Sequence, residues 1–221
     1  MMVIEPAHGI LVVADGMGGA PGGDVASSLA VEEVADGLRE GMGMKESILA
    51  ANRKILEMAG SQPALSGMGT TLTALKVSTG DRTYSMGHVG DSRAYLLSAG
   101  GFRQISKDHT MVQDMVEAGK IPASAAREHP FAHLLSRALG TDPHLLVDVG
   151  EGTIQEGDFF LLCSDGLVKV FDDGEIEEWM GRLGSESLEG VVDSMVAEAN
   201  DRGAPDNVTV AILGVGGTGS E

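Results

Sequence analysis

Four aspartates lie beside apolar or β-branched segments, at places where turns could gather their side chains at one end of a fold. Asp15 and Asp165 each follow an apolar run that should be a buried strand. Asp91 gives a looser version of the same pattern, and Asp206 stands just before a strand-like segment. A carboxylate beside a buried strand is costly unless it is paired or binds a metal ion, so the set predicts a cation site.

The chemistry of this set favours hard divalent cations. Oxygen ligands without cysteine or histidine select Mg²⁺ or Mn²⁺ over Zn²⁺. We expect Asp15 to bridge two ions roughly 3.5–4 Å apart, which could activate a water for in-line attack on phosphorus. Gly16 would add its carbonyl oxygen as a ligand. Asn207 would not bind an ion itself but would orient one of the side chains that do.

Each aspartate also has a simpler interpretation as a turn residue. Asp-Gly pairs are common in turns, so Asp15 and Asp165 would be plain turn residues in about half of random cases. Asp206 follows Pro205 and would be a turn residue more often than that. Only the joint occurrence of the aspartates favours a metal site.

The overall charge excludes some classes of partner. The chain has 221 residues and a formal net charge of −18. Nucleic acids and anionic membranes require a basic footprint, so neither is expected as a partner. A solvated acidic surface explains most of the 33 acidic residues better than any single site does.

Length and cysteine usage favour one intracellular domain. No linker divides the chain, so we expect a single domain over residues 1–213 and a flexible tail over 214–221. Cys163 is the single cysteine, which fits a reducing cytoplasm, and we interpret it as a small buried hydrophobe rather than a nucleophile. No basic N-terminal region precedes an apolar segment, and no apolar run approaches the ~18 residues of a membrane span. The expectation is a cytoplasmic monomer.

The order of hydrophobic patterns predicts helices, then many antiparallel strands, then helices. This order fits an α+β fold in which two packed sheets are flanked by helical layers. An insertion at about 108–139 is expected to form a mobile flap over the site. Helices are predicted at about 24–40, 45–59, 111–118, 175–180 and 187–200. Strands are predicted at 10–14, 70–77, 83–89, 93–97, 102–105, 145–149, 159–163 and 208–213.

Ordered motifs extend over nearly the whole chain. They are Val13-Ala14-Asp15-Gly16-Met17-Gly18-Gly19, Gly67-Met68-Gly69-Thr70-Thr71, Val89-Gly90-Asp91-Ser92-Arg93-Ala94-Tyr95, Cys163-Ser164-Asp165-Gly166-Leu167 and Ala204-Pro205-Asp206-Asn207-Val208-Thr209, with further matches at 107–110 and 136–140. Together they resemble the motifs of the metal-dependent (PPM, type 2C) protein serine/threonine phosphatases, most of all the bacterial branch.

The resemblance implies an α-β-β-α sandwich and hydrolysis of phosphoserine or phosphothreonine by a metal-activated water, without a covalent intermediate. Asp15, Asp165 and Asp206 would be the catalytic residues. They would hold two Mn²⁺ or Mg²⁺ ions together with Gly16, and Asp91 with Asp165 would hold a weaker third ion. The partners would be proteins phosphorylated by a bacterial-type serine/threonine kinase, or the kinase itself.

One segment that the family normally carries has no match. Members usually begin with a strand bearing Arg-x-x-Asn-Glu-Asp, and the nine residues before the predicted strand at 10–14 do not resemble it. Loss of that arginine would weaken phosphate binding by about 1.5–3 kcal/mol. Loss of an edge strand would expose its neighbour to unwanted pairing. Lys169, on the turn after Asp165, is a hypothetical replacement for the phosphate contact, and the alternative is a solvated surface lysine.

A second hypothesis is a catalytically impaired phosphatase-like domain that binds metal or phosphoprotein and acts as a regulator. The retained aspartates favour the enzyme, whereas the absent arginine favours the regulator. A metal-dependent nuclease is disfavoured because the chain lacks a basic surface that could hold a nucleic-acid backbone.

Overall fold

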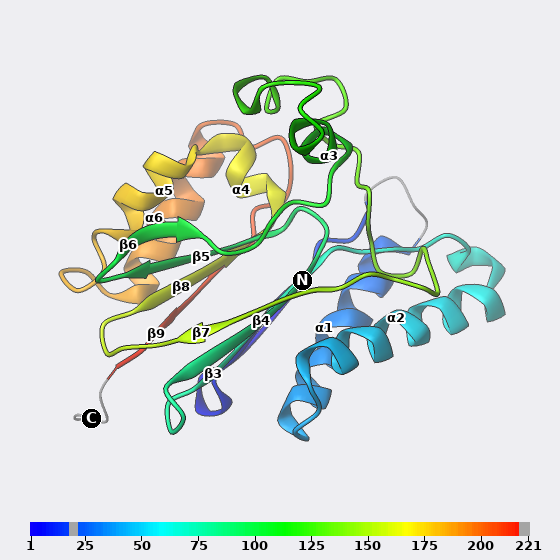
Figure 1. Ribbon diagram of the computed structural model, residues 1–221, viewed down its shortest axis with the longest axis horizontal. Coiled ribbons are helices and arrows are strands. Elements are labelled where there is room, and N and C mark those ends of the chain that lie inside the picture. The colour runs from blue at the N-terminus through cyan, green and yellow to red at the C-terminus, as the bar shows by residue number, and fades with distance from the viewer. Residues whose placement is uncertain (18–21, 217–221) are drawn as a thin grey trace.

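The computed structural model describes residues 1–17 and 22–216. Two antiparallel sheets pack face to face, and helices cover the outer face of each sheet (Figure 1). The predicted α-β-β-α sandwich is therefore confirmed. Within the described residues, no helix is long and apolar enough to cross a membrane.

The five-stranded sheet lies under the N-terminal helices. Its strands are β1 (Met2–Glu5), β2 (Ile10–Val13), β3 (Leu72–Ser78), β4 (Thr83–Val89) and β7 (Asp148–Thr153), and its helices are α1 (Gly23–Arg39) and α2 (Met44–Ser61). The strands lie in the order β1-β2-β3-β4-β7, and each neighbouring pair is antiparallel. Val34 of α1 and Ile48 of α2 share one apolar cluster with Ile10 and Val12 of β2.

The four-stranded sheet lies under the C-terminal helices. Its strands are β5 (Arg93–Ser98), β6 (Gly101–Gln104), β8 (Phe159–Cys163) and β9 (Val210–Gly214), and its helices are α4 (Asp165–Val170), α5 (Asp173–Met180) and α6 (Leu188–Asp201). The strands lie in the order β6-β5-β8-β9. A capping box between Asp172 and Glu175 begins α5. Tyr95 and Leu161 form the core on this side with Phe171.

The core between the sheets fixes the end of β2. Alternate side chains of a strand point to opposite faces, so Leu11 and Val13 join Phe160 and Leu162 between the sheets. Every residue of β2 is buried. The strand end that carries Asp15 is therefore held by close packing on both faces.

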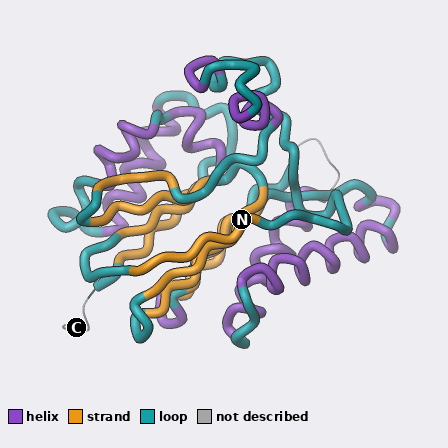
Figure 2. The backbone as a smooth tube through the Cα atoms, in the orientation of Figure 1, coloured by secondary structure: helices purple, strands orange, loops and turns teal. Residues whose placement is uncertain are grey.

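The segment between β6 and β7 forms the flap, which lies across the ends of the strands at the top of Figures 1 and 2. It contains α3 (Met111–Glu117) and the short 3-10 helix η3 (Ala123–Ala125). Isolated bridges between Thr110 and Leu135 and between Thr70 and Leu139 close its base. Mobility of this flap stays a prediction.

Two further 3-10 turns lie outside the flap, and they are η1 (Pro6–His8) and η2 (Pro63–Leu65).

A strand that the sequence did not predict borders the five-stranded sheet. β1 pairs with β2 from Met2 opposite Val13 to Glu5 opposite Ile10. The expectation that the sheet begins with the strand at 10–14 is therefore wrong, and β2 has a neighbour on both sides. Only one side chain of β1, Val3, packs against the core, so its apolar face is too short to produce a readable period.

Two other predictions fail near β7 and at the C-terminal end. β7 lies at 148–153 rather than 145–149, because Gly152 fits beside the ring of Tyr84 on β4, where a Cβ would lie 2.5 Å from that ring. Val215 is 8 % exposed and its backbone N–H donates to the carbonyl of Asp158 at 2.8 Å. Residues 214–216 are therefore part of the fold, and the rest of the predicted tail, 217–221, lies outside the described residues.

Candidate metal centre

Asp15 is positioned through its backbone by the Gly-Thr-Thr segment. Its N–H donates to the hydroxyl of Thr71 at 3.0 Å. Its carbonyl accepts from the N–H of Thr71 and from the hydroxyl of Thr70, each at 2.9 Å. Thr70 and Thr71 are both buried, so the turn after β2 has little freedom.

Asp91 is brought to the same place by the turn that leaves β4. Gly90 has a φ of +111°, and a Cβ on it would lie 2.6 Å from the Cβ of Thr71, so only glycine fits. The hydroxyl of Ser92, just after Asp91, lies 2.7 Å from the hydroxyl of Thr71. Thr71 thus connects the two loops that carry Asp15 and Asp91.

The loops that carry Asp165 and Asp206 are joined by a second set of contacts, which the side-chain hydroxyl of Ser164 makes. The hydroxyl of Ser164 donates to the carbonyl of Asn207 at 3.1 Å and accepts from the N–H of Thr209 at 3.0 Å. A Cβ on Gly166 would lie 2.3 Å from the carbonyl oxygen of Asn207. The backbone N–H of Asn207 donates to Asp206 Oδ1 at 2.9 Å, and the role of Asn207 in supporting a metal ligand stays a prediction.

Asp15 and Asp91 sit in an environment that penalises their charge. Burial, and then the neighbouring carboxylates of Asp165 and Asp206, raise the pKa of Asp15 to about 6. Burial, and then Asp165 and Asp108, raise the pKa of Asp91 to about 7. Asp165 Oδ1 is buried and has no hydrogen-bond partner among the described residues. A bound cation would relieve each of these penalties.

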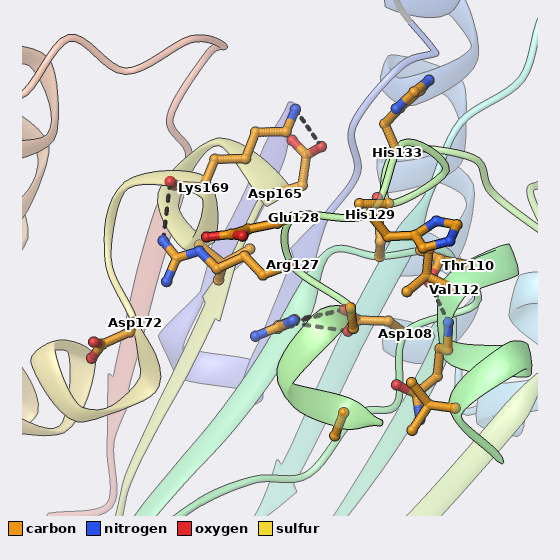
Figure 3. Close-up of a pocket in the computed structure, with 18 of the residues that line it drawn as sticks. Asp108, Thr110, Val112, Arg127, Glu128, His129, His133, Asp165, Lys169 and Asp172 are labelled. Carbon is orange, nitrogen blue, oxygen red and sulfur yellow. Dashed lines mark hydrogen bonds and ion pairs between the residues drawn. The ribbon is translucent and has the colours of Figure 1, made fainter. Parts of the chain in front are cut away.

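Lys169 lies between two of the acids. Its Nζ is 2.7 Å from Asp165 Oδ2 and 3.0 Å from Asp206 Oδ2 (Figure 3 shows the first of these contacts). Burial lowers the pKa of Lys169, but the hydrogen bonds to both acids outweigh it and raise that pKa to about 12. The bond from Lys169 also lowers the pKa of Asp206. The lysine is therefore not a free surface residue, and its partners here are carboxylates.

The residues present fit divalent ions. The donor set consists of carboxylate oxygens, which hard cations prefer, and the unpaired Asp165 Oδ1 is a ready ligand atom. Among the described residues, no three His, Cys, Asp or Glu side chains lie close enough together to hold an ion as they stand. Gly16 forms a backbone bridge with Thr70 beside the acids, while Gly18 and Gly19 lie outside the described residues.

A cleft of about 820 Å³ opens from the acids toward the flap (Figure 3). Of the four aspartates, Asp91 and Asp165 line this cleft, together with Lys169. The flap contributes Arg127 and Glu128, and Arg127 Nη2 donates to the carbonyl of Lys169 at 3.2 Å. The cleft therefore connects the flap with Asp91 and Asp165.

Comparisons with known proteins decide the family. A model of the family described as protein phosphatase 2C matches residues 2–204. The serine/threonine phosphatase stp of Listeria innocua is 36% identical over 214 residues, which cover 92% of this chain and 83% of that protein. The crystal structure of the Mycobacterium tuberculosis serine/threonine phosphatase PstP superposes with a TM-score of 0.85 at 33% identity and covers 98% of this chain and 92% of that one.

The chain belongs to the protein phosphatase 2C family. The resemblance predicted from the motifs is therefore confirmed, and the enzyme is a metal-dependent protein serine/threonine phosphatase. A structure of the catalytic domain of PstP that contains two manganese ions is 32% identical, has a TM-score of 0.85, and covers 98% of this chain and 91% of that one.

Two networks in the phosphatase were not predicted from sequence. Arg93 donates to both carboxylate oxygens of Asp108 on the cleft wall, with Nη2 2.8 Å from Oδ2. At the base of the flap, His109 Nε2 lies 3.1 Å from Asp148 Oδ2, and Arg137 Nη1 donates to Asp148 Oδ1 at 2.7 Å. Neither network has a local signal, because each joins residues from separate elements.

His109 also connects the flap to the Asp91 loop of the phosphatase. Its Nδ1 accepts from the backbone N–H of Gly90 at 3.2 Å, so its Nε2 carries the proton and donates to Asp148. Burial lowers the pKa of His109. For Asp148, burial raises the pKa, but the bonds from His109 and Arg137 outweigh it and lower that pKa.

Proposed function

We propose that Asp15, Gly16, Asp165 and Asp206 hold two catalytic divalent ions, Mn²⁺ or Mg²⁺, and that Asp91 with Asp165 holds a weaker third ion. The observation that carries this assignment is the buried Asp165 Oδ1, which has no partner among the described residues and lies among carboxylates whose charge is penalised by burial. Bound ions would supply a water nucleophile and neutralise charge on the phosphoryl group.

The chain's own residues hold this arrangement in place. Thr71 fixes the Asp15 and Asp91 loops relative to each other, and Ser164 does so for the Asp165 and Asp206 loops. Such preorganisation lets carboxylates act without rearranging during the reaction. We further propose that Lys169, once its carboxylate partners bind ions, presents its ammonium group to the phosphate of the substrate.

The proposed substrates are proteins phosphorylated by a bacterial-type serine/threonine kinase, or the kinase itself, and the proposed setting is a monomer in the cytoplasm. Support comes from the relatives, which are named serine/threonine phosphatases, and from the cleft that lies between the flap and two of the acids, Asp91 and Asp165. A nuclease activity has no support, because a net charge of −18 would repel a nucleic-acid backbone.

The test is hydrolysis of p-nitrophenyl phosphate and of a phosphothreonine peptide with and without Mn²⁺. Asp165→Asn should lower kcat by at least about 100-fold, since a charged ligand becomes neutral. Asp193→Asn is the matched control, because Asp193 is exposed on α6 and the same charge is lost there. Activity that survives Asp165→Asn would remove the assignment.

The regulatory alternative makes a different prediction. A catalytically impaired domain would bind Mn²⁺ or a phosphoprotein but would not turn over either substrate. Metal binding measured on the same preparations therefore separates an impaired enzyme from a misassigned site.

A further inference from the structure

We propose that the ammonium group of Lys169 is a built-in counter-ion of the metal-free site, and that divalent ions must displace it in order to bind. This inference rests on the ligand assignment proposed above. It concerns what Lys169 does before ions arrive, which is distinct from contact with a substrate.

The contacts place the ammonium where an ion would compete with it. Nζ of Lys169 lies 2.7 Å from Asp165 Oδ2 and 3.0 Å from Asp206 Oδ2. Both oxygens belong to side chains assigned to the metals. A carboxylate oxygen that accepts from an ammonium group has less electron density to offer a cation, and two positive groups in contact repel each other.

The surroundings make this ammonium important to the metal-free protein. Among the described residues, no other lysine or arginine forms an ion pair with Asp15, Asp91, Asp165 or Asp206. The carboxylate of Asp165 is only 19% exposed, so water screens it weakly. Without Lys169, these acids would face one another with no cationic side chain in contact.

The side chain can leave without disturbing the fold. The backbone of Lys169 is held in α4, and its carbonyl accepts from Arg127 Nη2 of the flap at 3.2 Å (Figure 3). The side chain itself is 36% exposed and borders the cleft. Rotation about its flexible methylene chain would carry the ammonium from the acids into the cleft while the backbone stays in place.

The test compares Lys169→Met with the unsubstituted 221-residue chain in the absence of substrate. Isothermal titration with Mn²⁺ should give a Kd about fivefold lower for the variant, because no ion pair has to be broken. In EDTA, the melting temperature of the variant should fall by about 2–4 °C, because the repulsion among the acids is no longer offset. With saturating Mn²⁺ this difference should vanish or reverse.

Matched variants separate the local effect from net charge. Lys54→Met removes the same charge from an exposed pair with Glu33 on α1 and α2, and it should leave the Kd for Mn²⁺ unchanged. Lys169→Arg keeps a cation and should bind Mn²⁺ about as the wild type does. Lys169→Gln is the second neutral variant and should repeat the Met result; circular dichroism in EDTA identifies which variants are folded.

The outcomes are distinguishable. A folded neutral variant that binds Mn²⁺ no more tightly than the wild type overturns the counter-ion role, whether or not the enzyme is active. A wild-type protein that binds no Mn²⁺ overturns the ligand assignment and this inference with it. Tighter binding by both neutral variants, but not by Lys54→Met, supports it.

Discussion

The hydroxyl of Thr71 accepts a hydrogen bond from the backbone N–H of Asp15 at 3.0 Å. The same hydroxyl lies 2.7 Å from that of Ser92, the residue after Asp91. Thr71 therefore sets the distance between two loops that carry proposed metal ligands, although it touches no proposed ion itself.

Thr71→Val should destabilise the protein by about 1–3 kcal/mol, because it leaves the Asp15 N–H buried without an acceptor. Mn²⁺ affinity should fall as well, since the loop that carries Asp15 loosens. Urea unfolding and Mn²⁺ titration measure the two effects. Thr71→Ser keeps the hydroxyl and should retain most of the stability and most of the Mn²⁺ affinity. Equal losses in Thr71→Val and Thr71→Ser would contradict the role of the Thr71 hydroxyl in holding the two loops.

Gly166→Ala should separate the loops that carry Asp165 and Asp206. The added Cβ would lie 2.3 Å from the carbonyl oxygen of Asn207, which is backbone and cannot turn away. Phosphatase activity should fall by at least about tenfold, as misplacement by a fraction of an ångström in a site suffices for that. Steady-state kinetics with the phosphothreonine peptide measure it.

The control for that change is Gly60→Ala. Gly60 lies in α2 and has open space around its Cβ position. The substitution should leave kcat unchanged and stabilise the helix by about 0.5–1 kcal/mol. An equal loss of activity in both variants would mean that the Gly166 contact is not what holds the loops.

Acidification should destabilise the fold through His88. Burial, and then the neighbouring His109, lower its pKa from 6.5 to about 4. Between these values the unfolded chain binds a proton that the folded chain does not, so stability is lost as pH falls from about 6.5 toward 4. The loss from this group should be roughly 2–4 kcal/mol. Urea unfolding in EDTA at several pH values measures it.

His88→Phe removes the titrating group and should flatten that part of the pH profile. The substitution removes His88 Nδ1, which lies 2.9 Å from the hydroxyl of Thr73. That hydroxyl still donates to the carbonyl of Ser92. His144→Phe, at an exposed position, serves as the control. A profile that keeps its slope in His88→Phe would assign the acid sensitivity elsewhere.

Arg137→Met should loosen the base of the flap. Arg137 and His109 hold the two oxygens of Asp148, and loss of a partly exposed ion pair costs about 0.2–1 kcal/mol. Cleavage within the flap by a low dose of protease should become about two- to fivefold faster, because local opening is then more frequent. Arg103→Met, at an exposed position on β6, is the control and should leave the rate of cleavage within the flap unchanged.

The sequence places the acids beside strand ends because these positions depend on local patterns, and their role as metal ligands stays a prediction. Asp15 and Asp165 end apolar strands and precede glycines, so their place at a sheet end follows from the chain itself. The contact of Lys169 with Asp206 was not predictable, because it joins two loops that only the four-stranded sheet brings together. The helical turn that places Lys169 on the side of the acids was expected, but its ion pair with the carboxylate of Asp206 was not.

The errors in strand position have the same physical origin. Leu145, Leu146 and Val147 have the composition of a strand, yet the residues that pair with β4 are those of β7, where Gly152 leaves space for the ring of Tyr84. Likewise β1 is defined by its pairing with β2 rather than by its own apolar pattern. Such tertiary selection overrides local propensity.

The proposed metal ligands are attached to different sheets of the sandwich. Asp15 follows β2 of the five-stranded sheet, whereas Asp165 follows β8 and Asp206 precedes β9 of the four-stranded sheet. Ions shared among them would therefore act as a cross-link between the two sheets. The strength with which the sheets hold together would then track the concentration of free divalent ions, so that supply of the cofactor would govern the lifetime of the folded enzyme as well as its turnover.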